Sequence, residues 1–326
     1  MKAILLREHG GPEVLTFGEH RSPKPATNEI LVKVHATALN RADILQREGK
    51  YPPPAGESDI LGLEMAGEVV ETGLEVEKWK SGNRVCGLLA GGGYAEYAVI
   101  HEDMALPIPD NLSFEEAAAI PEVFLTAFQA LHTLAHLQPR ERVLIHSGAS
   151  GVGTAAIQIA KMSDATVLVT ASGSKHDLCR ELGASFAVDY HTEDFEKEIM
   201  QQTYSQGVHI ILDFIGAPYL QKNLNLLSMD GRLVMLSMMG GIHVDDLQIS
   251  NILRKRLQII GSTLRNRSLE YKIALTRDFR LFAWDAFANG KLKSVIDKIF
   301  DWKGAAEAHR YMESNKSKGK IILKVR

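Results

Sequence analysis

Cysteine is scarce in this chain, and its scarcity limits what can hold the fold together. The 326 residues include two cysteines, Cys86 and Cys179, which lie far apart in the sequence. Their spacing fits neither a disulfide framework nor a metal site. A chain of this length can bury a full core without cross-links. We therefore expect a reduced, intracellular protein, located in the cytoplasm.

Long apolar runs and an excess of positive charge are also absent. The apolar runs are far shorter than the roughly 20 residues that span a bilayer. The short run at the start is interrupted by Arg7 and Glu8, so it predicts a first β-strand rather than a signal peptide. The net charge of −3 provides no global basic field to attract a polyanion. We expect neither a membrane nor a nucleic acid as a partner.

What the sequence does contain is a change of pattern near Pro121. Before it, alternating segments such as Ile30–Val34 and the stiff Tyr51–Pro54 corner predict an irregular β domain. After it, short Val/Ile/Leu runs alternate with amphipathic helices, as in a parallel sheet buried on both faces. The runs predict six strands, at 143–146, 166–170, 185–188, 209–214, 232–237 and 257–264.

This alternation predicts an α/β fold with a doubly wound parallel sheet, the Rossmann type that binds dinucleotides. A last strand is expected at 320–325, in KIILKV, where it would return to the β domain. The predicted domains are therefore 1–121, completed by 265–326, and a nucleotide domain at 122–264.

A glycine-rich loop follows the first strand of the nucleotide domain. The order is strand 143–146, loop Ser147–Gly153 and then a helix. Small residues let the backbone approach a pyrophosphate, which the N–H groups of the helix N-terminus then bind. Ser150 stands where the middle glycine of G-x-G-x-x-G is expected. The loop predicts cofactor contacts from residues that include Ser150, Gly151, Val152 and Gly153.

The end of the second strand distinguishes the two nicotinamide cofactors. An NAD enzyme usually carries Asp or Glu there, to bind the ribose hydroxyls. Here Thr170 is followed by residues that include Ser172 and Lys175, without an acid. This composition favours the 2′-phosphate of NADPH. The alternative for Lys175 is an ordinary place in the first turn of a helix, where a cation opposes the dipole.

Several motifs in the right order resemble the zinc-independent quinone oxidoreductase branch of the medium-chain dehydrogenase/reductase family, the group that includes zeta-crystallin. The matching segments are ALNRADILQREGKYPPP, ILGLEMAGEVVETG, GGGYAEYAV, AAAIPEVFLTAFQAL, VLIHSGASGVGTAAIQIAK, LGASFAVDY and GKIIL. The resemblance implies a GroES-like β-rich catalytic domain beside the Rossmann domain, and NADPH-dependent reduction of a quinone or related conjugated carbonyl. It also implies a homodimer that pairs edge strands, for which 257–264 is the apolar candidate.

The zinc enzymes of this superfamily have a Cys early in the chain, a Gly-His-Glu segment and a second Cys. In the corresponding places this sequence has Asn40–Asp43 and Gly62-Leu63-Glu64. Because a catalytic zinc needs three protein ligands, we expect no metal. His132 and His136 are four residues apart, as a metal pair on one helix face would be, but no third ligand is evident, which favours a solvated or packed pair of histidines.

The resemblance also assigns roles to individual residues. Tyr51 is expected to be catalytic, donating a hydrogen bond or proton to developing charge; the alternative is a surface aromatic packed on prolines. Asn40 either contacts the cofactor or caps the following helix, and Thr126 either lies near the nicotinamide or bonds its own backbone. The remaining expected cofactor contacts are Tyr190, Met238, Thr263 and Lys320, of which Lys320 has the alternative of a solvated strand lysine.

Other polar residues favour structural roles. His146 is expected to be a hydrogen-bonded structural histidine, and Glu64 to support the architecture. Asp43 and Arg41 are either catalytic or an ion pair that holds the loop. Two rival functions stay open: an enone or alkenal double-bond reductase, and a nucleotide-regulated RNA-binding or structural protein. The acidic net charge and the lack of interleaved basic and aromatic motifs weigh against the second.

Overall fold

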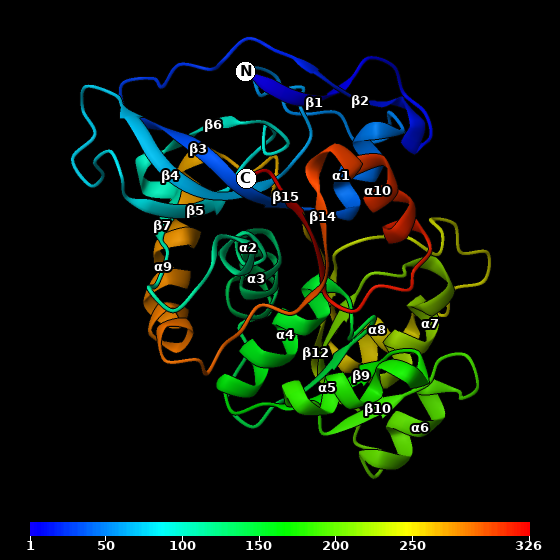
Figure 1. Cartoon of the computed structure of the whole chain (residues 1–326). Coiled ribbons are helices and arrows are strands. Elements are labelled where there is room, and N and C mark those ends of the chain that lie inside the picture. The colour runs from blue at the N-terminus through cyan, green and yellow to red at the C-terminus, as the bar shows by residue number, and fades with distance from the viewer. The chain divides into compact units, whose positions relative to one another are not determined.

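The structure is a computed structural model that describes all residues from Met1 to Arg326. The chain divides into two compact units. Unit 1 comprises Met1–Leu125 and Leu264–Arg326, and unit 2 comprises Thr126–Thr263 (Figure 1). No helix combines the length and the apolar character that crossing a bilayer demands.

Unit 2 is built on a six-stranded sheet in the order β10-β9-β8-β11-β12-β13, with every pair parallel. The strands are β8 (Arg142–Ile145), β9 (Thr166–Thr170), β10 (Phe186–Val188), β11 (Val208–Asp213), β12 (Leu227–Met235) and β13 (Gln258–Gly261). The chain starts at the central β8 and adds β9 and β10 on one side. It then crosses back and adds β11, β12 and β13 on the other side of β8. This is the doubly wound Rossmann order, so the predicted fold class is confirmed.

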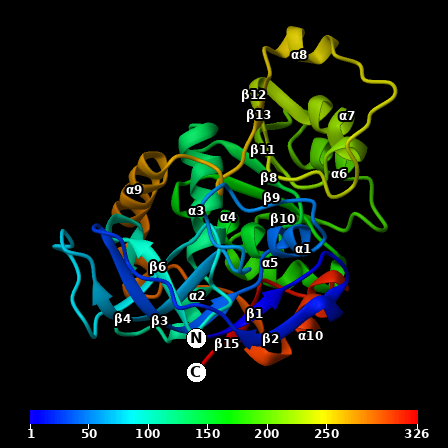
Figure 2. The same cartoon turned by 90° about the horizontal axis from the view of Figure 1, so that it is seen from above.

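Helices alternate with these strands, and α4 lies beside α5 while α6 lies beside α7 (Figure 2). The helices are α4 (Gly151–Met162), α5 (His176–Leu182), α6 (Phe195–Gln202), α7 (Ala217–Leu226) and α8 (Ser250–Lys255). Leu144, Leu168 and Ile211 meet in the core of the sheet at matching register. Each such buried side chain stabilises the fold by about 1.5–3 kcal/mol, which explains why the strands read as continuous apolar runs.

Unit 1 contains a seven-stranded sheet in the order β14-β15-β3-β4-β5-β7, with β6 paired to β3, and a separate β1–β2 hairpin. The strands are β1 (Lys2–Leu6), β2 (Leu15–Glu19), β3 (Glu29–Ala38), β4 (Glu64–Thr72), β5 (Arg84–Leu88), β6 (Tyr97–His101), β7 (Ala105–Pro107), β14 (Ile296–Asp301) and β15 (Lys320–Lys324). The helices are α1 (Arg41–Arg47), α2 (Phe114–Ala118), α9 (Leu269–Ala288) and α10 (Ala305–Glu313). β15 pairs antiparallel with β3, placing Ile322 opposite Ala38.

The helix that contains His132 ends before His136. Helix α3 (Pro121–Phe128) continues as a π-helical segment, Gln129–Leu134, and then stops. His136 lies beyond it with a φ of 49°, so His132 and His136 do not share a helix face. Instead, His132 Nε2 lies 3.0 Å from Ser163 Oγ. The metal-pair spacing is therefore a coincidence of the sequence.

Candidate functional site

The glycine-rich loop has the geometry that a phosphate-binding turn requires. It leads from β8 into α4, whose N-cap residue Ser150 accepts a hydrogen bond from the Gly153 N–H at 3.1 Å. A Cβ on Gly153 would lie 2.4 Å from the Ser147 carbonyl oxygen and 2.6 Å from that of Gly148. Only glycine fits there, because backbone atoms cannot move aside. The loop thus places the N-terminus of a twelve-residue helix, with its free N–H groups, at the end of β8.

The loops that follow β9 and β10 in unit 2 contact each other. Ser172 follows β9, and its hydroxyl lies 3.3 Å from the hydroxyl of Tyr190, which follows β10. Ser172 Oγ also lies 3.5 Å from His191 Nε2. The structure therefore brings together Ser172 and Tyr190, two of the residues expected to contact the cofactor. His191 was missed by the sequence analysis, although its place next to Tyr190 at the end of a strand was the available signal.

An acid also lies near this cluster, and it follows β10 rather than β9. The Asp189 carboxylate accepts hydrogen bonds from the N–H groups of Gly173, at 2.9 Å, and His191, at 3.1 Å. The His191 bond chiefly, with the Gly173 bond, lowers the pKa of Asp189. The Asp189 carboxylate thus connects the loop after β9 with the loop after β10.

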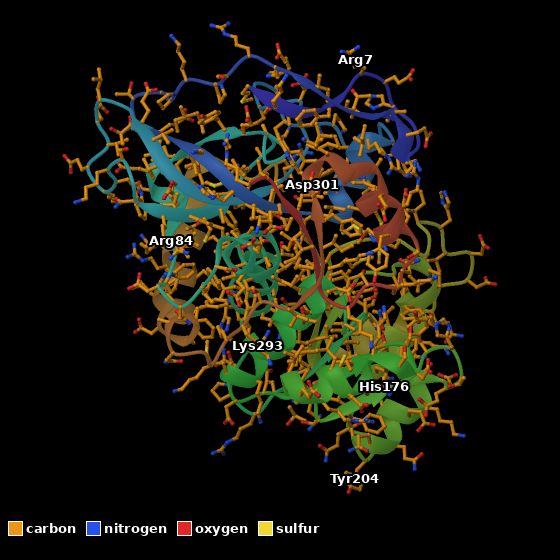
Figure 3. All side chains as sticks on the ribbon, in the orientation of Figure 1. Arg7, Arg84, His176, Tyr204, Lys293 and Asp301 are labelled. Atoms are coloured by element: carbon orange, nitrogen blue, oxygen red, sulfur yellow. The ribbon has the colours of Figure 1, made fainter.

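Lys175 ends a short 3₁₀ turn and takes the N-cap position of α5. Lys175 therefore lies just before the first turn of α5, whereas the alternative interpretation placed it within that turn. The next residue, His176 (labelled in Figure 3), lies with its Nε2 3.0 Å from the Ala171 carbonyl oxygen. This contact fixes the turn that follows β9, and with it the position of the Lys175 backbone.

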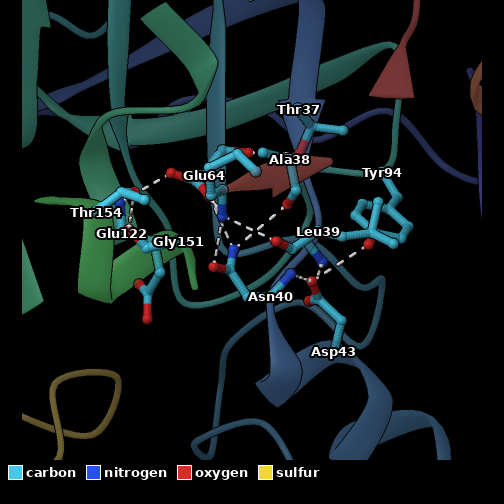
Figure 4. Close-up of polar contacts among 12 residues, drawn as sticks. Thr37, Ala38, Leu39, Asn40, Asp43, Glu64, Tyr94, Glu122, Gly151 and Thr154 are labelled. Atoms are coloured by element: carbon cyan, nitrogen blue, oxygen red, sulfur yellow. Dashed lines mark hydrogen bonds and ion pairs between the residues drawn. The ribbon is translucent and has the colours of Figure 1, made fainter. Parts of the chain in front are cut away.

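A buried polar network lies in unit 1, where β3, β4 and β15 meet (Figure 4). Lys320 Nζ donates to Leu39 O at 2.8 Å, to Asn40 Oδ1 at 2.7 Å and to Glu64 Oε1 at 2.7 Å. An ammonium group has three donors, so all three are used. Lys320 is only 3 % exposed, and the alternative of a solvated strand lysine is wrong.

Asn40 belongs to the same network. Its side-chain N–H donates to Glu64 Oε1 at 2.8 Å while its oxygen accepts from Lys320. Asn40 also precedes α1, and its backbone N–H donates to Asp43 Oδ2 at 2.7 Å. Glu64 thus collects hydrogen bonds from two side chains, which gives it the architectural role that was expected.

Asp43 is not paired with Arg41, so the ion-pair alternative for these two residues is wrong. The Asp43 carboxylate is buried and accepts from the Gly62 N–H at 3.1 Å and the Tyr94 hydroxyl at 3.2 Å. Arg41 instead donates to the Met312 carbonyl oxygen at 3.0 Å. Burial raises the pKa of Asp43 to about 6, although its hydrogen bonds oppose the shift.

Tyr51 is half-buried and lies beside a cation that the sequence analysis did not identify. The Arg265 guanidinium carbon is 5.4 Å from the centre of the Tyr51 ring, within the range of a cation–π contact. Arg265 is itself held by Gln46 Oε1 and Ala90 O, both at 2.7 Å. Burial raises the pKa of Tyr51, so its hydroxyl keeps its proton at neutral pH and can donate a hydrogen bond.

Glu122, in the first turn of α3, was also missed. Its backbone N–H donates to Glu64 Oε2 at 2.8 Å (Figure 4). Burial, and then the nearby charge of Glu64, raise the pKa of Glu122 to about 8. The sequence could not reveal this, because Glu64 is far from Glu122 along the chain.

The other predicted residues are spread over unit 2. Thr126 lies in α3 and is partly buried. Met238 is 55 % exposed and follows β12, while Thr263 follows β13. Because Met235 and Gly261 are register partners, Met238 and Thr263 follow strands that end at the same edge of the sheet, the edge where ligands bind in such folds.

His146 has the structural role that was predicted. It is fully buried at the end of β8, with Nδ1 3.0 Å from Thr170 Oγ1 and Nε2 2.8 Å from Asn223 Oδ1. Burial lowers the pKa of His146 to about 4, so the ring is neutral at physiological pH.

Comparison with known proteins agrees with this architecture. Residues 26–110 match the alcohol dehydrogenase GroES-like domain, and residues 151–278 match the zinc-binding dehydrogenase domain. The rat quinone oxidoreductase is 31 % identical over 99 % of this chain and 97 % of its own length. Among solved structures, an NAD-dependent alcohol dehydrogenase has a TM-score of 0.88 at 32 % identity, covering 100 % of both chains. The CurK enoyl reductase has a TM-score of 0.89 at 30 % identity, covering 99 % of this chain and 98 % of its own.

Although one matching domain is described as zinc-binding, the residues here do not fit a zinc ion. The chain contains no group of three His, Cys, Asp or Glu side chains able to hold a metal. At the place where ligands would be expected, the Lys320 ammonium group is bonded to Glu64. The phosphate loop, in contrast, has the small residues and helix N-terminus that a nicotinamide dinucleotide needs. The chain belongs to the medium-chain dehydrogenase/reductase family of nicotinamide-dependent oxidoreductases.

Proposed function

We propose that this protein is an NADPH-dependent quinone oxidoreductase that reduces quinones or related conjugated carbonyls without zinc. The observation that carries the proposal is the meeting of Ser172, Tyr190 and His191 beyond the phosphate loop. The full-length similarity to a quinone oxidoreductase supports the substrate class. The two free, buried cysteines are compatible with a cytoplasmic location.

The residues at the end of β9 favour NADPH over NADH. Two hydroxyls and an imidazole gather there, and Lys175 precedes α5. The acid in the vicinity, Asp189, is bound by two backbone N–H groups and is not the ribose-binding acid after β9 that an NAD enzyme carries. We assign this cluster to the 2′-phosphate, and we assign the pyrophosphate to residues 150–153.

We expect kcat/KM for NADPH to exceed that for NADH. Lys175→Ala should lower the NADPH value by roughly tenfold to a hundredfold, the equivalent of a charge-assisted hydrogen bond of about 1.5–3 kcal/mol. In this variant kcat/KM for NADH should stay within twofold of the wild-type value. Lys197→Ala, a control at an exposed site on α6, should change kcat/KM for either cofactor by less than twofold. Equal use of both cofactors by the wild type would contradict the assignment.

The decisive test of function is NADPH consumption with a panel of quinones and acyclic enones. The similarity to CurK makes an enoyl-type double-bond reductase the second candidate, and faster turnover of the enones would favour it. Chelator-treated protein, checked for residual zinc, should keep its activity. Salt-sensitive RNA binding without NADPH oxidation would overturn both enzymatic assignments.

Within unit 1, we assign Tyr51 to substrate contact. If its hydroxyl donates to charge developing on the acceptor, Tyr51→Phe should lower kcat by roughly fivefold, or about 1 kcal/mol, because a quinone delocalises that charge. Tyr51→Ala should also raise KM. Both variants must bind NADPH and unfold near the wild-type temperature. Wild-type kinetics for the Ala variant across several quinones would remove Tyr51 from the site.

We also propose a homodimer formed through β13. This strand is at one edge of the sheet, and its Ile259 is 43 % exposed. An apolar edge with unpaired backbone groups is an association site unless another strand covers it. A second copy of the same strand would satisfy these groups.

A further inference from the structure

We propose that Arg265 is a positioning residue for the reaction, which holds Tyr51 in place and makes the Tyr51 hydroxyl a stronger hydrogen-bond donor. The inference rests on the proposed function, because it concerns the residue assigned there to substrate contact. Both residues belong to unit 1, and every contact that carries the inference lies within that unit.

Arg265 is a buried cation with a partner for each of its three nitrogen atoms. It is only 6 % exposed. Its Nε donates to the Ala90 carbonyl oxygen and its Nη2 to Gln46 Oε1, both at 2.7 Å, while its Nη1 donates to the Tyr51 carbonyl oxygen at 3.4 Å. These acceptors belong to three segments: the turn after β5, helix α1 and the loop after α1. The planar guanidinium group is therefore fixed in position and in orientation.

Gln46 extends this set of contacts to a fourth segment. It is 3 % exposed, and its Nε2 donates to the Asp59 carbonyl oxygen at 3.0 Å while its Oε1 accepts from Arg265. Because one end of the amide must accept and the other must donate, its orientation is determined. Arg265 is thus bonded to a side chain that is itself fixed, and it cannot turn away from Tyr51.

Tyr51 receives two contacts from Arg265 and keeps its hydroxyl free. The guanidinium carbon lies 5.4 Å from the centre of the Tyr51 ring, and Nη1 bonds the Tyr51 carbonyl oxygen. Residues 52–54 are prolines, which offer no backbone N–H to hold this loop. The Tyr51 hydroxyl takes part in none of the hydrogen bonds of the structure. Arg265 therefore holds the ring while the hydroxyl stays available to an acceptor.

The charge of Arg265 also acts on the Tyr51 hydroxyl. A cation over the ring favours the ionised form of the phenol. Burial raises the pKa of Tyr51, the charge of Arg265 opposes that increase, and the charge of Glu122 adds to it. A phenol that releases its proton more readily is a stronger hydrogen-bond donor to negative charge that develops on an acceptor. Arg265 thus offsets part of the effect of burial on the donor strength of Tyr51.

The test is a double-mutant cycle on Arg265 and Tyr51, with a quinone as the acceptor and NADPH at saturation. Arg265→Gln should lower kcat roughly threefold to fivefold. In the Tyr51→Phe background the same substitution should lower kcat by less than about 1.5-fold, because the hydroxyl on which Arg265 acts is gone. An equal loss of kcat in the two backgrounds would overturn the inference, since Arg265 would then act on the acceptor itself or on the fold.

The matched control is Arg267→Gln. The Arg267 guanidinium carbon lies 4.8 Å from the centre of the Tyr271 ring, so this substitution removes a cation–π contact of the same kind elsewhere in unit 1. It should leave kcat within about 1.5-fold of the wild-type value. A loss of kcat as large as that of Arg265→Gln would count against a specific role of Arg265.

Arg265→Lys keeps a buried cation, so it tests the inference even if Arg265→Gln does not fold. The ammonium group lacks the planar fork of the guanidinium and cannot hold all three segments in the same way. The lysine variant should lose less kcat than Arg265→Gln, and the loss should again require the Tyr51 hydroxyl. A loss that persists in Tyr51→Phe would contradict the inference.

A readout independent of turnover is fluorine NMR of 3-fluorotyrosine incorporated at position 51. Arg265→Gln should raise the pKa of this phenol, Arg265→Lys should raise it less, and Arg267→Gln should leave it unchanged. An unchanged pKa in Arg265→Gln would overturn the inference. A wild type that reduces no acceptor would overturn the proposed function, whereas the fluorine titration would still decide whether Arg265 acts on the Tyr51 hydroxyl.

Discussion

Replacing Lys320 by Met is expected to lower the free energy of unfolding by about 3–5 kcal/mol. The substitution preserves the apolar stem but leaves the Glu64 carboxylate, which is fully buried, without its cation. It also leaves Asn40 Oδ1 and Leu39 O without their donor. Urea unfolding at neutral pH, followed by circular dichroism, measures the loss.

Two further variants separate charge from packing. In the double variant Lys320→Met/Glu64→Gln, no uncompensated charge remains, but the single amide oxygen can keep only one of the two bonds that Asn40 and the Glu122 N–H donate to the separate oxygens of Glu64; part of the lost stability should return. Lys324→Met removes an exposed lysine of the same strand, paired with Glu115, and should leave the urea midpoint close to that of the wild type, because exposed ion pairs contribute little to stability. If Lys320 instead contacts NADPH directly, Lys320→Met will weaken NADPH binding and leave the unfolding midpoint unchanged.

Below pH 6.5 the contribution of His146 to the free energy of unfolding should fall progressively, by up to about 3 kcal/mol at 1.36 kcal/mol per pKa unit. Burial lowers the pKa of His146 to about 4, whereas the unfolded ring titrates near 6.5. Because the unfolded state binds the proton more readily, the contribution is complete above pH 6.5 and disappears as pH falls to about 4. His309, whose pKa burial and Arg47 lower to about 3, acts in the same direction.

The measurement is the free energy of unfolding of wild type and His146→Gln between pH 8 and pH 4. The variant should be less stable at pH 8, because Gln cannot reach both Thr170 and Asn223, and the wild-type stability minus that of the variant should shrink by up to about 3 kcal/mol as pH falls to 4. His243→Gln, at an exposed site, should reproduce the wild-type curve. Parallel curves for wild type and His146→Gln would show that His146 does not titrate as its burial implies.

The strands of unit 2 could be predicted because a strand buried on both faces must be apolar throughout. The six runs correspond to β8–β13, although 257–264 shortens to Gln258–Gly261. The phosphate loop was recognisable for a similar reason: Gly153 meets backbone atoms that exclude any side chain. In both cases the requirement, apolar residues throughout a strand or glycine at one position, concerns residues close together in the sequence. A local sequence pattern is therefore enough to predict the structure.

The polar networks could not be predicted, because they join residues from distant segments. Lys320 is 256 residues from Glu64, and no local pattern distinguishes it from the exposed Lys324. The error over Asp43 and Arg41 has the opposite origin: the two are close in sequence, but Asp43 turns toward Tyr94 and Arg41 toward α10. Likewise, Asp189, the acid near Ser172, comes from the loop after the neighbouring strand β10.

The pairing of β15 with β3 has a consequence for the order in which the chain acquires its structure during translation. Unit 2 is continuous, so it can fold as soon as Thr263 has left the ribosome. Unit 1 must wait for β15, since Glu64 has no counter-ion until Lys320 emerges. The β3–β4 segment is synthesised before unit 2 but can complete its sheet only after unit 2 has folded, and until then the edge of β3 and the side chain of Glu64 have no partner from β15. A ribosome stalled beyond residue 263 should carry a protease-resistant unit 2 attached to a protease-sensitive unit 1.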